Sequence, residues 1–211
     1  LAQVTAGLSS GLIVHGYSAR QQAVHHLGLP DERRFAVIPH GNYLDSYPDG
    51  ITRAAARRRL ALDDSRLMFL FLGAVRPYKG ILELLAAFQH QRPKDAVLVI
   101  AGEPLDADFC RKIEAAIAET DNIRFYPGFV PNAEIQVYMN ASDVVVLPYR
   151  RVLSSGAALL AMSFGKPCVA PATGSLPDVL DNSGAFLYDP GVETGLTESL
   201  RQAVEAREML A

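Results

Sequence analysis

The sequence has no excess of basic residues and no long apolar segment. Its 20 lysines and arginines are outnumbered by 23 aspartates and glutamates, which gives a net charge of -3 at pH 7. Proteins that bind a phosphate backbone usually carry a basic surplus or stripe, so we expect no nucleic-acid partner. The longest apolar runs, such as Leu67–Val75, fall well short of the roughly 20 residues that cross a bilayer, so we expect no transmembrane segment.

The motifs of common cofactor and metal sites are also missing. The sequence contains neither GxGxxG nor the Walker lysine motif, which counts against dinucleotides and against ATP hydrolysis. The adjacent His25 and His26 have no spaced Cys, Asp or Glu to complete a metal site. The two cysteines, Cys110 and Cys168, lie far apart without CxxC spacing, and we expect buried thiols in a reducing compartment. These absences predict a cytoplasmic protein with no metal ion and no cofactor.

The sequence does contain a regular alternation of β-branched runs and segments of helical period. Several runs, such as Val144–Leu147, are apolar at every position, which is typical of strands buried on both faces. The alternation predicts an α/β fold, a Rossmann-like doubly wound parallel sheet. The expected strands are Gly11–His15, Phe35–Pro39, Met68–Gly73, Ala96–Ala101, Ile123–Tyr126, Asp143–Leu147, Pro167–Ala170 and Ala185–Tyr188.

Helices are expected between and after these strands. In Lys79–Gln89 the apolar residues fall on one stripe, as in a crossover helix that lies on a sheet. We interpret the consecutive arginines Arg57–Arg59 as the solvated face of a short helix. The other expected helices are Thr52–Leu60, Asp106–Glu119, Asn132–Ala141, Ser154–Phe164 and Val192–Leu210.

The first 34 residues stand apart from this pattern. They contain a single strand-to-helix unit, with Ser18 as the expected N-cap of the helix. Because there is no initiator methionine, we expect that Leu1 lies inside a longer protein. We therefore predict two regions. Residues 1–34 form the tail of a preceding N-terminal domain with a linker near Pro30–Arg34, and residues 35–211 form the Rossmann-like domain.

Ligands bind outside the carboxyl ends of the strands in an open doubly wound sheet, so the loops there are the candidate sites. The loop Gly73–Gly80 puts Arg76 and Lys79 close to the start of a helix, where backbone N–H groups and the macrodipole favour an anion. Arginine can bind two phosphate oxygens while lysine acts as a point charge, so the pair fits a diphosphate. The alternative is that both cations are simply solvated.

Three further loops are candidates. Ser154-Ser155-Gly156 at the start of a helix offers hydroxyl and N–H groups to an anion, although one serine could be only an N-cap. The segment Pro39–Tyr43 contains His40, and Gly128–Pro131 contains Phe129. Taken alone, His40 is more often a structural residue than a base, and Phe129 more often part of a core than a platform for a nucleobase.

The order of these loops resembles the C-terminal domain of GT-B glycosyltransferases of family 4, also called group 1. GAVRPYKG resembles the family's GRL-x-x-x-KG segment, AGEPLD its strand-end glycine turn, FYPGFVPNAEI its base-binding loop and ASDVVVLPY the strand before its donor loop. AMSFGKPCVAPATGSLPDVL matches the family's AMA-x-GKPVVA-x-x-x-GG-x-PE segment almost residue for residue. The resemblance runs from about Phe35 to the end of the chain, and GLIVHGYS resembles the last strand and helix of the family's N-terminal domain.

The resemblance implies a domain that binds a nucleoside-diphosphate sugar. Arg76 and Lys79 would bind the donor diphosphate and stabilise it as it leaves, without a metal ion. The base-binding loop would meet the nucleobase mainly through its backbone, and the Ser-Ser-Gly segment would line the phosphate and the sugar. The substrate contacts expected beyond the two cations are Gly41, Asn42, Gly73, Glu103, Phe129, Val130, Ser154, Ser155 and Gly156.

The rest of the reaction is assigned to the missing N-terminal domain. That domain would hold the acceptor, a glycan, a lipid or a small molecule, and would make any contact with a membrane. By the same resemblance we expect retention of the anomeric configuration and no activity from this chain alone.

The sequence departs from the family at the E-x7-E pattern of the donor helix. In the family the first glutamate touches the sugar and the second the ribose hydroxyls, whereas alignment puts Val152 and Leu160 there. An apolar side chain at the ribose position predicts weak discrimination between ribo- and 2'-deoxyribonucleotides. Two alternatives to a divergent transferase stay open: a non-catalytic nucleotide-binding or assembly module of GT-B shape, and a sugar-nucleotide epimerase. An epimerase would need acidic and histidine residues at the cleft, where only Glu103, Asp106 and His40 are candidates.

Overall fold

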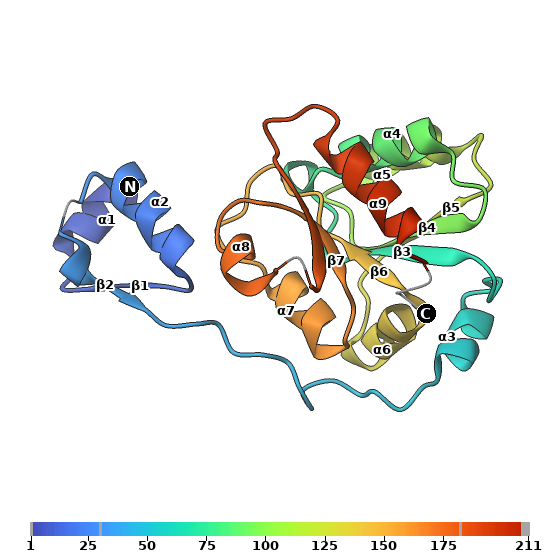
Figure 1. Ribbon diagram of the computed structural model, residues 1–211, viewed down its shortest axis with the longest axis horizontal. Helices are drawn as coiled ribbons and strands as arrows, with labels where there is room; N and C mark the ends of the chain where they lie inside the picture. The colour runs from blue at the N-terminus through green and yellow to red at the C-terminus, as the bar shows by residue number, and fades with distance from the viewer. Residues whose placement is uncertain (1, 30, 182, 208–211) are drawn as a thin grey trace.

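A six-stranded parallel sheet forms the centre of the larger of two units in a computed structural model that describes residues 2–29, 31–181 and 183–207 (Figure 1). The strands are β3 (Leu67–Leu72), β4 (Ala96–Gly102), β5 (Ile123–Pro127), β6 (Val144–Val146), β7 (Cys168–Pro171) and β8 (Ala185–Tyr188), in the spatial order β5-β4-β3-β6-β7-β8. Every residue of β3, β4 and β6 is buried, because these strands are covered on both faces. The prediction of a doubly wound Rossmann-like sheet is confirmed, and its order reverses between β3 and β6.

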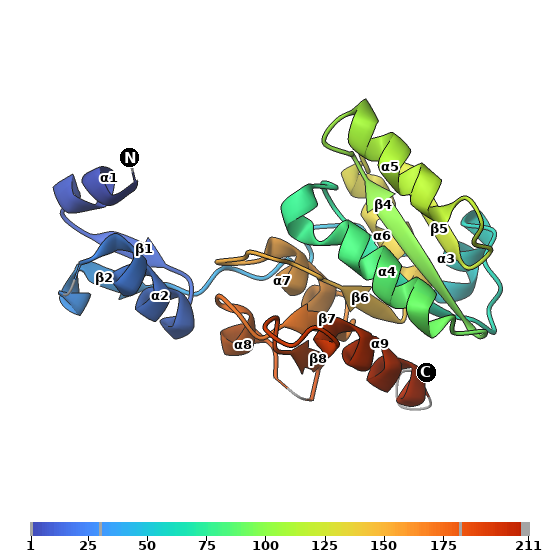
Figure 2. The same ribbon diagram turned by 90° about the horizontal axis from the view of Figure 1, so that it is seen from above.

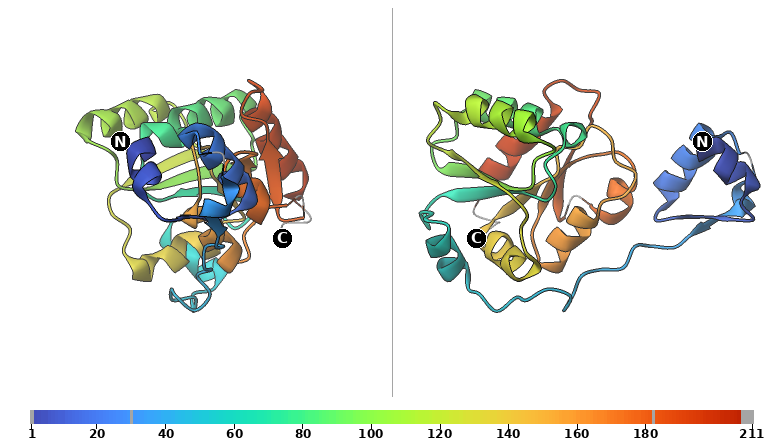
Figure 3. Two further views of the ribbon diagram at one scale, coloured as in Figure 1. Left: turned by 90° about the vertical axis from the view of Figure 1, so that its left-hand side faces the viewer. Right: turned by 180° about the vertical axis from the view of Figure 1, so that it is seen from behind.

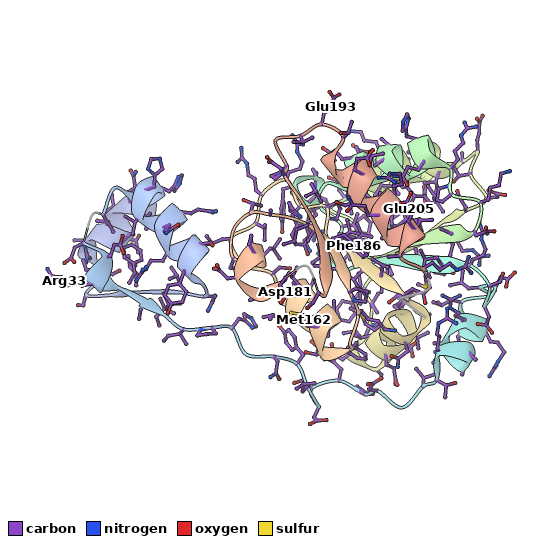
Figure 4. The ribbon with its side chains drawn as sticks, in the orientation of Figure 1. Arg33, Met162, Asp181, Phe186, Glu193 and Glu205 are labelled. Atoms are coloured by element: carbon purple, nitrogen blue, oxygen red, sulfur yellow. The ribbon has the colours of Figure 1, made fainter. Side chains whose placement is uncertain are left out.

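Helices cover both faces of this sheet (Figure 2). On one face lie α4 (Ile81–Gln91), α5 (Ala107–Ile117) and α9 (Gly195–Glu205); on the other lie α3 (Arg53–Arg59), α6 (Asn132–Ala141) and α7 (Gly156–Ser163), and the short α8 (Leu176–Val179) follows β7. The predicted apolar stripe of α4 is buried against the sheet. The outer face of α9 carries charge, as expected: Glu205 lies there (Figure 4), and Arg201 pairs with it and with Glu198.

A smaller unit at the N-terminus has a sheet of its own. It comprises α1 (Ala2–Leu8), β1 (Leu12–Val14), α2 (Tyr17–Leu27), a short 3-10 helix (Glu32–Arg34) and β2 (Phe35–Val37). Strand β2 pairs with β1 in parallel, and Phe35 is buried with Val14 and Ala19 in a small separate core. Strand β2, which the sequence analysis assigned to the larger region, therefore belongs to the sheet of the N-terminal unit, and Pro30 of the predicted linker lies outside the described residues.

Residues 38–52 connect the two units as an extended strap that runs along the outside of α7 and α6 (Figure 3). Hydrogen bonds fix the strap to both helices. The backbone N–H of Tyr43 donates to Ser163 Oγ at 3.0 Å, and the N–H groups of Gly50 and Ile51 donate to Gln136 Oε1 at 2.9 and 3.1 Å. The strap is thus part of the surface of the larger unit.

One arginine of the predicted solvated helix face is buried instead. Arg57 has no exposed surface, pairs with Asp143 at the start of β6, and also donates to backbone carbonyls, including that of Ala141. Because α3 packs against α6, one side of this short helix faces inward, and the carboxylate there requires a positive partner. Arg58 and Arg59 are exposed, as expected.

Two smaller predictions were also wrong. Ser18 is not the N-cap of α2, since Gly16 holds that position; Ser18 donates instead from its N–H and its hydroxyl to Asp178 on α8, at 2.9 and 2.7 Å. These bonds join the N-terminal unit to the larger one. Cys110 is only partly buried on the outer side of α5, whereas Cys168 is buried in β7, where burial raises the pKa of its thiol to about 12.

Candidate functional site

A cavity of about 510 Å³ opens beyond the carboxyl ends of β3 and β4, beside the start of α7. The reversal of strand order between β3 and β6 separates the loops that follow these strands, and this leaves a crevice at the switch point. The cavity is within the size range of small-molecule sites. Its lining residues are Tyr43, Tyr47, Leu72, Gly73, Ala74, Lys79, Gly102, Glu103, Phe129, Val130, Ile135, Gly156, Ala157 and Leu160.

Lys79 supplies the positive charge of this cavity. It ends a 3-10 turn, Pro77–Lys79, that leads through Gly80 into α4. Its ammonium group lies near Gly73, where an added Cβ would be 3.6 Å from Nζ, and over the rings of Phe71 and Tyr149 at 5.8 and 5.6 Å from their centres. Lys79 therefore sits between an aromatic floor and the cavity.

No carboxylate among the described residues pairs with the Lys79 ammonium group. Burial, and secondarily the nearby charge of Arg76, lower the pKa of Lys79 below its ordinary value. A partly desolvated cation without a counter-charge is costly, and an anionic ligand would relieve that cost. This is the chemistry of an anion site.

Arg76 lies beside the cavity but is not one of its lining residues. Its Nη1 donates to the carbonyl oxygens of Val75 and Glu103, at 3.1 and 2.8 Å, which holds the guanidinium against the ends of β3 and β4. The structure thus distinguishes the two cations that the sequence paired: Lys79 lines the cavity, whereas Arg76 lies outside its lining and close enough to influence the charge of Lys79.

The loops after β3 and β6 are packed together below this cavity. Gly80 has a φ of 70°, and a Cβ atom there would overlap the carbonyl oxygen of Pro148, so only glycine fits. Arg150 donates its N–H to the Tyr78 carbonyl oxygen at 3.0 Å. Tyr149 is buried beneath Lys79, and burial raises the pKa of its phenol to about 12. These contacts fix the start of α4 relative to the start of α7.

The Ser-Ser-Gly segment meets the cavity only through its glycine. Ser155 is the N-cap of α7, since its Oγ accepts from Ala158 N at 3.2 Å, and Ser154 is exposed outside the cavity. Gly156 lines the cavity with Ala157. For Ser155, the structure therefore favours the N-cap alternative.

The strap contributes two aromatic residues that the sequence analysis missed. Tyr43 and Tyr47 line the cavity, with ring centres 5.7 Å apart. Gly41 and Asn42, the predicted contacts in this segment, are exposed and do not line it. The sequence analysis singled out Pro39–Tyr43 as a candidate loop. The position of Tyr47 could not be predicted, because it depends on how the strap packs against the larger unit.

The opposite wall comes from the loop after β5. Phe129 is 75% exposed and lines the cavity together with Val130. The same two residues border a second hollow of about 320 Å³ next to Tyr126 and Tyr138. Phe129 is therefore not a core residue.

The two positions of the missing glutamates separate in the structure. Leu160 lines the cavity from α7, whereas Val152 borders an apolar groove of about 710 Å³ between α2 and the loops after β3 and β6. A larger hollow of about 660 Å³ at the amino ends of β3, β4 and β5 contains none of the predicted site residues. Among residues 2–29, 31–181 and 183–207, no cluster of His, Cys, Asp or Glu could hold a metal ion, and no helix is long and apolar enough to cross a membrane.

Comparison with known families gives an extended match. The sequence model of the family described as Glycosyl transferases group 1 matches residues 52–211. GDP-mannose:glycolipid 4-beta-D-mannosyltransferase of Xanthomonas campestris pv. campestris is 29% identical over 173 residues, which cover 81% of this chain and 47% of that protein. D-inositol 3-phosphate glycosyltransferase of Segniliparus rotundus is 33% identical over 166 residues, 75% of this chain and 36% of that protein. The chain spans about half the length of the curated relatives it matches, or less.

Solved structures share the fold. Sucrose-phosphate synthase from Thermosynechococcus elongatus superposes with a TM-score of 0.81 at 24% identity, over 97% of this chain and 51% of that one. HepE from Anabaena, solved in complex with UDP-glucose, gives a TM-score of 0.79 at 19% identity, over 99% of this chain and 60% of that one. Both likenesses extend over the N-terminal unit as well as the six-stranded sheet.

Proposed function

Because this chain belongs to the glycosyl transferases of group 1, we propose that it forms the donor-binding part of a glycosyltransferase and holds a nucleoside-diphosphate sugar. The solved relative from Anabaena was crystallised with UDP-glucose, and the first curated relative is described as using GDP-mannose. Both ligands are nucleoside-diphosphate sugars, which supports this class of donor for the cavity.

The observation that supports this proposal most directly is the ammonium group of Lys79, which lines the cavity and forms no ion pair with a described carboxylate. A diphosphate would provide the missing negative charge, in a crevice where the aromatic rings of Phe71 and Tyr149 limit the access of water to the cation. The nucleobase would then lie toward Phe129 and Val130, which expose apolar surface and backbone.

The same charge would serve the reaction. Cleavage of the bond between sugar and diphosphate leaves negative charge on the departing phosphate, and a fixed cation stabilises that charge as it develops. Lys79 is held in place by packed loops, so little reorganisation is needed at that moment. Arg76, close to Lys79, adds positive potential.

The acceptor and any catalytic base belong to the part of the protein outside this chain, which is about half of its relatives' length. We therefore expect this chain alone to bind the donor but not to transfer sugar to a glycan, a lipid or a small molecule. We expect transfer in the cytoplasm and with retention of the anomeric configuration. NMR of the product formed by the complete protein tests the configuration.

Calorimetry with UDP, GDP and ADP, each compared with its monophosphate, tests the donor site. The native chain should bind at least one diphosphate more tightly than the corresponding monophosphate. Lys79→Met should reduce diphosphate affinity by about tenfold to a hundredfold, the value of a lost charge-assisted hydrogen bond. The matched control is Lys112→Met, because Lys112 is exposed on α5 away from the cavity. Equal affinities for mono- and diphosphates in the native chain would contradict the proposal.

A further inference from the structure

The cavity has few polar side chains with which to hold a ligand. Its side chains from α6 and α7 are hydrocarbon, namely Ile135, Ala157 and Leu160. The polar side chains of its lining are Lys79 and Glu103, both from loops at the ends of strands, and the two tyrosines of the strap. The neutral hydroxyl groups available in this wall are therefore those of Tyr43 and Tyr47.

Tyr43 is fixed along one face of α7. Its backbone N–H donates to Ser163 Oγ in the last turn of the helix, and its phenol oxygen would lie 3.0 Å from a Cβ added to Gly156 in the first turn. Gly156, Leu160 and Ser163 are spaced i, i+4 and i+7, so they share one face of the helix. The Tyr43 side chain thus runs back along that face, past Leu160, and brings its hydroxyl to the start of α7.

Gly156 leaves room for this approach because it has no side chain. A methyl group at position 156 would meet the phenol oxygen at less than ordinary contact distance, which places the hydroxyl almost directly over the glycine. Among the described residues, the Tyr43 hydroxyl donates to no acceptor and accepts from no donor, and the side chain is half-buried. A hydroxyl in a partly desolvated wall retains its full hydrogen-bonding capacity for a ligand.

We propose that the Tyr43 hydroxyl binds a ribose hydroxyl of the nucleotide and sets the preference of the site for ribonucleotides. The inference rests on the proposed function, since it assumes a nucleoside diphosphate in the cavity. The ribose is the neutral, hydroxyl-bearing part of that ligand and lies between the diphosphate and the base. A phenol both donates and accepts, so it matches a ribose hydroxyl, whereas Lys79 matches the phosphates. This proposal replaces the expectation of weak ribose discrimination, which was drawn from Leu160 alone. The group that recognises the ribose is the Tyr43 hydroxyl of the strap and not a side chain of α7.

The test compares the affinities of a nucleoside diphosphate and its 2'-deoxy and 3'-deoxy forms, measured by calorimetry with whichever of UDP, GDP or ADP binds best. The native chain should prefer the ribonucleotide over at least one deoxy form by about threefold to tenfold, the range of one neutral hydrogen bond. Tyr43→Phe should bring that ratio to about one, and should weaken the deoxy form little. Tyr17→Phe, which removes an exposed tyrosine hydroxyl from α2, should leave the ratio unchanged.

The outcomes separate this inference from the proposed function. If diphosphates bind the native chain but the ratio is the same in Tyr43→Phe, the inference is wrong and the donor site stands. Loss of the ratio in Tyr47→Phe, with Tyr43→Phe unaffected, assigns ribose recognition to the neighbouring ring and also overturns it. If no nucleoside diphosphate binds the native chain, the proposed function is wrong, and the inference about Tyr43 is wrong with it. Circular dichroism of each variant checks that the fold is unchanged.

Discussion

Raising the pH should weaken the binding of a nucleoside diphosphate in a way that depends on Lys79. Burial, followed by the charge of Arg76, lowers the pKa of this lysine in the free protein. A bound diphosphate stabilises the ammonium form and therefore raises the pKa again. The affinity is therefore highest below the pKa of Lys79 in the free protein. It falls as the pH rises through that pKa, and it is constant again above the pKa of Lys79 in the complex.

The size of this effect follows from one charged contact. A charge-assisted hydrogen bond contributes about 1.5–3 kcal/mol, and this contribution is lost when the ammonium group gives up its proton. Affinity should then fall by about tenfold to a hundredfold across that window. Binding within the window should take up a fraction of a proton, because the lysine is recharged by the ligand.

Calorimetry in two buffers of different ionisation enthalpy measures this proton uptake directly. The titration should start above about pH 7, since the last ionisation of a phosphate falls near pH 6. Lys79→Arg is the informative control, because a guanidinium stays charged throughout and should abolish the Lys79-dependent proton uptake. Identical pH profiles for the native chain and Lys79→Arg would refute the assignment of the diphosphate to this lysine, whatever the absolute affinities are.

Two further predictions concern the stability of the fold. Arg57→Met should lower the free energy of unfolding by about 1.5–3 kcal/mol in denaturant titrations, because the Asp143 carboxylate loses its buried charged partner and keeps its ion pair with Arg53. Arg58→Met, on the exposed side of the same helix, should change it by less than about 0.5 kcal/mol. Gly80→Ala should cost more than about 1 kcal/mol, since its positive φ disfavours a side chain and the new Cβ would displace Pro148; a variant as stable as the native chain would contradict the observed loop contact.

The strands of the large sheet could be predicted from the sequence because their signal is local. A strand covered by helices on both faces must be apolar at every position, and β3, β4 and β6 show this without reference to any other part of the chain. The position of Lys79 at the cavity could be predicted for a related reason. It follows a buried strand and precedes a helix, and such loops gather at one edge of a parallel sheet.

The partners of residues far apart in the sequence could not be predicted in this way. Arg57 belongs to a run of three arginines that share the same local chemistry, and its burial depends on Asp143, 86 residues further along the chain. Tyr47 lies in a segment without helical or strand period, so nothing local placed it in the cavity. Ser18 has the side chain of an N-cap, but a carboxylate 160 residues away is its partner in the structure.

The strap that joins the two units also forms a wall of the cavity, so the same segment serves as linker and as lining. A ligand that touches Tyr43 or Tyr47 has different contacts for each arrangement of the strap, and therefore a different affinity for each. Thermodynamic reciprocity then requires the converse: occupancy of the cavity must bias the strap toward the arrangement that binds best, and by the same factor. Since the strap begins where β2 ends, the N-terminal unit is attached directly to the segment that would respond.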